Sequence, residues 1–284
     1  MRRATFLLIL LLSGCSLQKL ALKSTVGLMQ YGVEAIYSEP DMELAEQAIG
    51  SNLKLLEGFL QAEPKNKQLL MLLTQGFASY SLGFVEDSNP KRAARFYLRA
   101  RDYGFRYLRQ TSAFRDSIPF KNKFFRRSLQ NLKGKEIPAV FWTAFAWAGW
   151  INLNKDNPRA VYDLTRVKLM MNYVLKNDES FFFGSAHLFF GSVYGSLPKM
   201  LGGNPYKAKM EFEKSYKISK NKFLLVNVYF ARYYAATTLN ERLFSETLQA
   251  VLDAPDHILP GYELITAIAK EKARLLLQKK EDLF

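Results

Sequence analysis

Apolar residues recur along almost the whole chain at the three- and four-residue spacing of an amphipathic helix, and few segments alternate as a strand would. Helix starts are marked by a repeated device, Asn-Pro followed within a turn by Ala, at Asn89, Asn157 and Asn204. The Asn side chain can cap a free first-turn amide, and Pro suits the first helical position. We therefore predict an all-α fold, with helices over residues 20–37, 41–62, 66–85, 90–114, 121–133, 137–153, 157–176, 180–200, 205–219, 221–239, 241–253 and 260–281.

The short connections between these helices predict antiparallel neighbours. Gly191 and Tyr194 lie in one helix, and Ala208-x-x-x-Phe212 opens the next, a pairing of small and large residues typical of tetratricopeptide repeats. We predict a tetratricopeptide-like α-α superhelix, made of stacked antiparallel helix pairs, as a single domain over residues 15–284. The Asn-Pro starts are unevenly spaced, so a plain helical array without true repeats is the alternative.

The first residues have the three parts of a secretory signal. Arg2 and Arg3 are followed by the apolar run Phe6 to Leu12, then by Ser13-Gly14-Cys15. The run is too short to span a bilayer, which needs roughly 20 apolar residues. Leu12-Ser13-Gly14-Cys15 matches the lipobox of lipoprotein signal peptidase, which implies that residues 1–14 are a cleaved signal peptide and that Cys15 carries the lipid. Ser16 resembles the pattern for transport to the outer membrane, so we expect a membrane-anchored lipoprotein facing the periplasm.

The net charge of +14 is concentrated in one segment. Residues 91–135 contain most of the excess Lys and Arg but only two acids, Asp102 and Asp116. Helical spacing aligns five arginines on one face: Arg92, Arg95, Arg99, Arg106 and Arg109. We expect Asp102 to pair with Arg99 and Arg106. The face is either merely solvated, or binds a carboxylate-bearing partner or an anionic leaflet. On the second interpretation, Arg95→Glu with Arg99→Glu leaves helicity intact and weakens binding.

Aromatic residues surround two of the predicted helices, at 141–150 and 181–194. A helix that is apolar all round is buried or lines an apolar cavity. Core packing is the simpler interpretation. The alternative is a ligand pore, for which the candidate wall residues are Trp142, Trp147, His187 and Tyr194.

The sequence gives little support for catalysis. His187 and His257 are the only histidines, Cys15 is the only cysteine, and no phosphate-binding loop or metal-ligand motif occurs. We therefore predict no enzymatic activity, no cofactor, no metal site and no nucleic-acid partner. For His187, a buried structural role is favoured over ligand contact.

Several ordered motifs together carry a family resemblance. They are Asn52–Gly58, Ala78–Tyr80, Phe84–Glu86, Arg99–Tyr103, Gly184–Gly191, Pro198, Gly202–Ser215, Tyr229–Ala235, Ala273–Leu277 and Glu281–Phe284. In this order and spacing the chain resembles TatT, the T component of tripartite ATP-independent periplasmic (TRAP) transporters. Two features depart from the pattern: the basic stretch 114–135 fits no motif, and Ser215 stands where Ala is usual.

The resemblance implies a tetratricopeptide-like lipoprotein adaptor that docks the periplasmic solute-binding (P) component of a TRAP system. It further implies a homotrimer, and a pore that holds a small apolar or carboxylate ligand. The alternative is a scaffold lipoprotein of an outer-membrane assembly machine, which would grip peptides on its concave surface.

Overall fold

The computed structural model describes residues 27–29, 31–115 and 117–284; Cys15 and the predicted signal peptide lie outside the described residues. These residues are helical with no strand, which confirms the all-α prediction. Within them, no helix combines the length and apolarity needed to cross a bilayer. The α-helices are α2 (Met42–Ala62), α3 (Lys67–Tyr80), α4 (Pro90–Arg109), α5 (Asn122–Gln130), α6 (Ile137–Asn152), α7 (Pro158–Asn177), α8 (Phe181–Ser196), α9 (Pro205–Ser219), α10 (Leu225–Phe230), α11 (Glu241–Asp253) and α12 (Glu263–Gln278).

The predicted helix starts agree better with the structure than the predicted helix ends. The side chains of Asn89, Asn157 and Asn204 each accept a hydrogen bond from a first-turn backbone N–H, at 2.9–3.0 Å. The helix predicted over 90–114 ends at Arg109, and the one over 180–200 ends at Ser196. Pro198 explains the second difference, because a proline cannot continue an α-helix.

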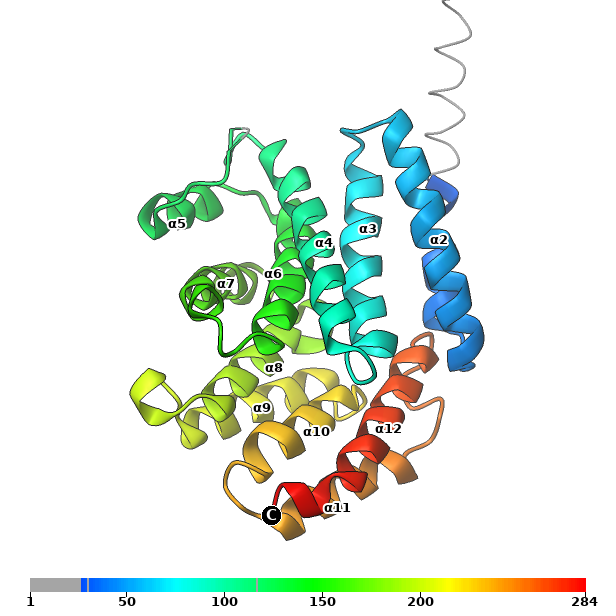
Figure 1. Cartoon of the computed structure of the whole chain (residues 1–284), viewed down its shortest axis with the longest axis vertical. Coiled ribbons are helices and arrows are strands. Elements are labelled where there is room, and N and C mark those ends of the chain that lie inside the picture. Colours follow the sequence, from blue (N-terminus) through cyan, green and yellow to red (C-terminus); the bar gives the residue numbers. More distant parts are fainter. Residues whose placement is uncertain (1–26, 30, 116) are drawn as a thin grey trace, which may run out of the picture.

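Helices that are neighbours in sequence pack in pairs, namely α2 with α3, α3 with α4, α6 with α7, α8 with α9, and α11 with α12. The array then curls on itself, so that α12 contacts both α10 and α2 (Figure 1). Tyr37, in the helical segment 31–37, closes this contact with ring centroids 5.2 Å from Tyr262. The helices therefore surround a common interior.

Two short π-helical turns interrupt the array. They are η1 (Ser81–Val85), which continues α3, and η4 (Ala231–Ala235), which continues α10. Gly195 of α8 makes room for η4, since a Cβ atom at residue 195 would lie 1.9 Å from the backbone oxygen of Tyr233. π-turns inside α-helices are frequently found at functional sites, so the interior beside η1 and η4 is the place to look for one.

Candidate ligand-binding pocket

A cavity of about 560 Å³ lies inside the helical array, a size typical of small-molecule sites. Its wall is built from both π-turns together with α6, α7, α8, α10 and α12. Five lining residues are exposed, and they mark where the cavity opens: Lys155, Val161, Thr165, Pro198 and Leu201. Other lining residues are buried, among them Ile49 and Ile265.

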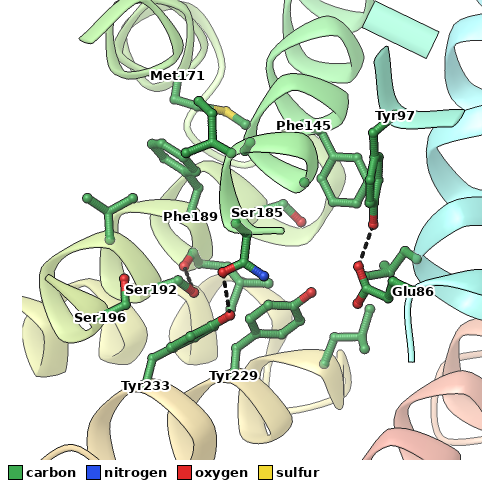
Figure 2. A pocket seen from close by; sticks show the side chains of 18 of the residues that line it. Glu86, Tyr97, Phe145, Met171, Ser185, Phe189, Ser192, Ser196, Tyr229 and Tyr233 are labelled. Carbon is green, nitrogen blue, oxygen red and sulfur yellow. Dashed lines mark hydrogen bonds between the residues drawn. The ribbon is translucent and has the colours of Figure 1, made fainter. Parts of the chain in front are cut away.

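Most of the wall is apolar, and two of its serine hydroxyls are already bound. Tyr229 and Tyr233 lie on one wall, with Phe145, Phe189 and Met171 facing them (Figure 2). Ser185 Oγ donates to the carbonyl of Phe182, and Ser192 Oγ donates to that of Leu188, at 2.6 and 2.8 Å. The cavity is therefore suited to an apolar molecule.

The single carboxylate of the wall, Glu86, is neutralised. Tyr97 Oη donates to it at 2.7 Å, and buried Lys272 of α12 binds both Glu86, at 2.8 Å, and Asp87, at 2.5 Å. Burial alone would lower the pKa of Lys272, but the two carboxylates raise it above its usual value. Burial and the charge of Glu86 raise the pKa of Tyr97 well above its ordinary value, so its hydroxyl stays protonated.

Two cations of the wall have no such partner. Neither Lys155 nor Lys168 has an acidic group within 4.0 Å among the described residues. Burial lowers the pKa of both lysines, and the charge of Arg232 lowers that of Lys155 further. The lining thus has an excess of positive charge.

Of the four wall residues proposed from the sequence, Trp142 lines the cavity, whereas Trp147, His187 and Tyr194 are not among its lining residues. Trp147 is buried, and its Nε1–H donates to Asp163 at 3.2 Å. Tyr194 packs on Phe190, with Lys207 Nζ 5.8 Å from its ring centroid.

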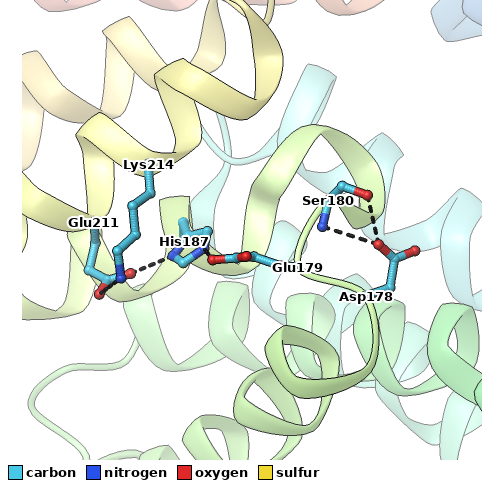
Figure 3. A network of polar contacts seen from close by, with 6 residues as sticks. All are labelled: Asp178, Glu179, Ser180, His187, Glu211 and Lys214. Atoms are coloured by element: carbon cyan, nitrogen blue, oxygen red, sulfur yellow. Dashed lines mark hydrogen bonds and ion pairs between the residues drawn. The ribbon is translucent and has the colours of Figure 1, made fainter.

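His187 is bound between two carboxylates of different segments (Figure 3). Its Nδ1 lies 2.5 Å from Glu211 of α9, and its Nε2 lies 2.8 Å from Glu179, which precedes α8. Each ring nitrogen therefore has a carboxylate oxygen within hydrogen-bonding distance. Between Glu179 and His187 the backbone of Phe182, Phe183 and Gly184 is left-handed. His187 therefore joins the two sides of a strained turn and ties it to α9, the structural role favoured from the sequence.

The arginine face of α4 divides into two groups. Arg99 pairs with buried Glu57 of α2 and lies over Phe77, while Arg106 donates to the carbonyl of Pro64 at 3.0 Å. Arg95 and Arg109 are exposed, as is Arg92, which lies over Phe96. The expected pairing of Asp102 with Arg99 and Arg106 is wrong, because Arg101 binds Asp102 at 2.7 Å. Arg99 and Arg106 thus hold α4 against neighbouring segments.

The sequence did not single out Glu86, Lys155, Tyr229 or Tyr233 as lining residues. Tyr229 and Tyr233 are four residues apart, so they share a helix face, which is a signal that the sequence contains. Lys155 follows α6 in a polar loop and carries no such signal. Among the described residues no group of three or more His, Cys, Asp or Glu is placed to hold a metal ion.

Comparison with known proteins identifies the family. The family model of the TRAP transporter T-component matches residues 38–284, which is nearly the whole chain. No curated protein shows significant similarity to it. The chain therefore belongs to the TRAP transporter T-component family, as its sequence motifs indicated.

Proposed function

We propose that this TRAP T-component is an adaptor that docks the periplasmic solute-binding component of its transport system and holds a small, mainly apolar ligand in the central cavity. The observation that supports this proposal most is the cavity itself, which lies within the helical array and has exposed lining residues at its opening. A ligand site with a defined mouth suits a protein that exchanges a solute with a partner. We infer no enzymatic role.

Exposed apolar side chains surround the mouth and suit a docking partner. Met200 and Leu201 follow α8, and Tyr206 begins α9; Met200 is almost entirely exposed. Tyr162 of α7, next to the lining residue Val161, stacks on exposed Phe120 with ring centroids 6.4 Å apart. Clustered exposed apolar residues commonly mark interaction surfaces. A partner seated there would cover the cavity during solute transfer.

Ligand holding is tested by filling the cavity. Ser192→Trp places a large side chain in the lining, whereas Ser51→Trp places the same side chain on the exposed surface of α2. We expect Ser192→Trp to abolish binding of the neutral dye N-phenyl-naphthylamine, measured by fluorescence, and Ser51→Trp to leave it unchanged. Equal dye binding by both variants would refute the cavity as the ligand site.

Docking is tested by capture from bacterial envelopes. We expect the protein to recover a periplasmic solute-binding protein, and Met200→Glu with Leu201→Glu to reduce the recovery at least tenfold, because charged groups would be buried at the contact. Leu239→Glu, at an exposed apolar residue that does not line the cavity, is the control. Recovery of outer-membrane assembly proteins without any solute-binding protein would favour the scaffold function instead.

The anchoring and assembly proposals rest on the sequence and the family. We propose that acyl chains on Cys15 hold the protein at the membrane, facing the periplasm, and that it forms a homotrimer. Cys15→Ser is expected to move the protein from the membrane to the soluble fraction without changing its circular dichroism. A Cys15→Ser protein that remains membrane-bound would refute the anchor, and analytical ultracentrifugation of the released protein would test the trimer.

A further inference from the structure

Two cations from different elements lie against one aromatic ring of the cavity wall. Lys155 follows α6, and Arg232 belongs to the π-turn η4. Lys155 Nζ lies 5.5 Å, and Arg232 Cζ 5.3 Å, from the ring centroid of Tyr233. Lys155 and Tyr233 both line the cavity, and Lys155 is one of the exposed residues at its opening. Arg232 does not line the cavity itself; it is exposed and lies over the ring of Tyr233.

Neither cation of this pair forms an ion pair. Among the described residues no acid lies within 4.0 Å of Lys155 or Arg232, although the more distant charges of Glu86 and Asp87, which Lys272 binds, contribute to raising the pKa of Arg232. The charge of Arg232 adds to burial in lowering the pKa of Lys155. Lys155 is thus a partly desolvated cation with a second positive charge nearby, and a bound anion would stabilise its charged form.

Neutral polar groups complete the surroundings of the pair. Tyr233 Oη donates to Asn152 Oδ1 at 3.1 Å, which leaves the amide N–H groups of Asn152 as donors. Tyr229, whose ring centroid is 5.8 Å from that of Tyr233, has a hydroxyl without a partner among the described residues. Burial raises the pKa of Tyr229 well above its ordinary value, so this hydroxyl remains a donor.

We propose that Lys155 and Arg232 form an anion-binding subsite, and that the ligand is an amphiphile whose acidic head binds there while its apolar tail fills the cavity. This inference rests on the proposed ligand-holding function and adds the ligand's chemical class and orientation. A carboxylate and a phosphate ester share the required chemistry. Lys168 on α7 lines the same wall, but burial is the cause of its lowered pKa and no neighbouring charge of the described residues adds to it. Two cations hold an anion more strongly than one.

The test compares three ligands with the same tail: dodecanoate, dodecyl phosphate and dodecanol. Their affinities are measured by displacement of N-phenyl-naphthylamine from the full chain. We expect the acids to bind about tenfold or more tightly than the alcohol, since a hydrogen bond to a charged group adds that much discrimination. The stronger of the two acids identifies the head as a carboxylate or a phosphate.

Charge-removing variants locate the subsite. Lys155→Met with Arg232→Met is expected to lower the affinity for the acids to that for dodecanol, while dodecanol binding is unchanged. Lys168→Met, elsewhere in the wall, and Lys176→Met, exposed on α7, are expected to keep the preference for acids. If the double variant unfolds, as judged by circular dichroism, Lys155→Met alone is expected to lose part of the preference.

The outcomes separate this inference from the function on which it rests. Equal binding of acid and alcohol by the wild-type protein would overturn the subsite, as would an acid preference that survives Lys155→Met with Arg232→Met, or one that is lost in Lys168→Met. In each case the cavity still binds apolar tails, so the proposed function stands. Failure of the dye, the alcohol and both acids to bind would overturn both proposals.

Discussion

At the scale of single residues, the arginines of α4 show that a charge pattern in the sequence does not reveal which charged side chains form ion pairs in the fold. Helical spacing predicted that Arg95 and Arg99 share one face with Arg92, Arg106 and Arg109, and all five lie in α4. It could not show that Arg99 meets a buried carboxylate of another helix, whereas Arg95 is exposed. The same limit applies to His187, whose buried role was favoured from its apolar neighbours, although its partners Glu179 and Glu211 come from segments that only the fold brings together.

Reversing the charge at residue 95 and at residue 99 should therefore have different effects on the free energy of unfolding. Arg99→Glu removes a partner of Glu57 and places a like charge beside it, so we expect a loss of about 1–3 kcal/mol in the free energy of unfolding. Arg95→Glu changes an exposed side chain, and we expect a change within about 0.5 kcal/mol. Urea denaturation followed by circular dichroism measures both; equal losses would show that Glu57 does not depend on Arg99.

This difference changes the binding experiment that the sequence suggested. Arg95→Glu with Arg99→Glu would confuse weakened binding with weakened folding. Arg95→Glu with Arg109→Glu alters only exposed arginines. We expect this pair to leave the thermal unfolding midpoint unchanged and to weaken binding to anionic vesicles or to an acidic partner, measured by co-sedimentation. Unchanged binding at physiological salt would assign the exposed arginines to solvation alone.

Glu57 also predicts a pH dependence. Burial alone would raise its pKa, but hydrogen bonds from Lys54 and Tyr103, both at 2.6 Å, and the charge of Arg99 lower it below the usual value. A carboxyl whose pKa is lower in the folded state stabilises the fold above its unfolded pKa, about 4.3, and this contribution is lost as the pH falls through the folded pKa. We expect Glu57→Gln to reduce the loss of unfolding free energy between pH 6 and pH 3, measured by urea denaturation at each pH. The same loss in the wild-type protein and the variant would contradict this.

At the scale of elements, capping was predictable and the π-turns were not. An Asn-Pro pair acts within one helical turn, so Asn89, Asn157 and Asn204 marked helix starts from the sequence alone. The π-turns η1 and η4 lie inside ordinary helical patterns, and no local residue type signals the wider hydrogen-bonded turn. Glu86 directly follows η1 and Tyr233 lies in η4. Since the π-turns could not be predicted from the sequence, these polar residues of the cavity wall could not be predicted either.

A substitution at Gly195 tests how closely α8 and η4 must approach each other. Gly195→Ala would place a Cβ atom against the backbone of Tyr233, so the two helices must separate. We expect a loss of about 1–3 kcal/mol in the free energy of unfolding, typical of overpacking, together with weaker dye binding. Gly58→Ala, in an open position on α2, is the matched control and should stabilise by about 0.5–1 kcal/mol. A stabilised Gly195→Ala protein would refute the close contact.

At the scale of the whole molecule, the contact between the first and last helices encloses the cavity. Lys272 of α12 binds Glu86 and Asp87, which follow η1, so this ion cluster links the C-terminal helix to the N-terminal half. The sequence predicted that helices would follow one another in pairs. It could not predict that the array closes on itself, because that depends on the sum of all the packing angles.

Removing this link should affect folding and the cavity together. Lys272→Met leaves two carboxylates without their cation, and a loss of about 3–5 kcal/mol in the free energy of unfolding is expected for a broken buried pair. Faster hydrogen exchange should appear in α12 and α2 first. Lys272→Met with Glu86→Gln should recover part of the stability; no recovery would mean that the lysine acts through packing alone.

The π-turns also have a consequence for comparing related chains. A π-turn holds one residue more than the α-helical turn it replaces, so it is equivalent to a single-residue insertion that the helix has absorbed. Deleting Gly83 would restore the regular turn, and each later residue would rotate by about 100° relative to α3. Glu86 would then leave the cavity wall although the helix remained intact. Within this family, a one-residue gap in either turn would therefore identify members with a different cavity chemistry.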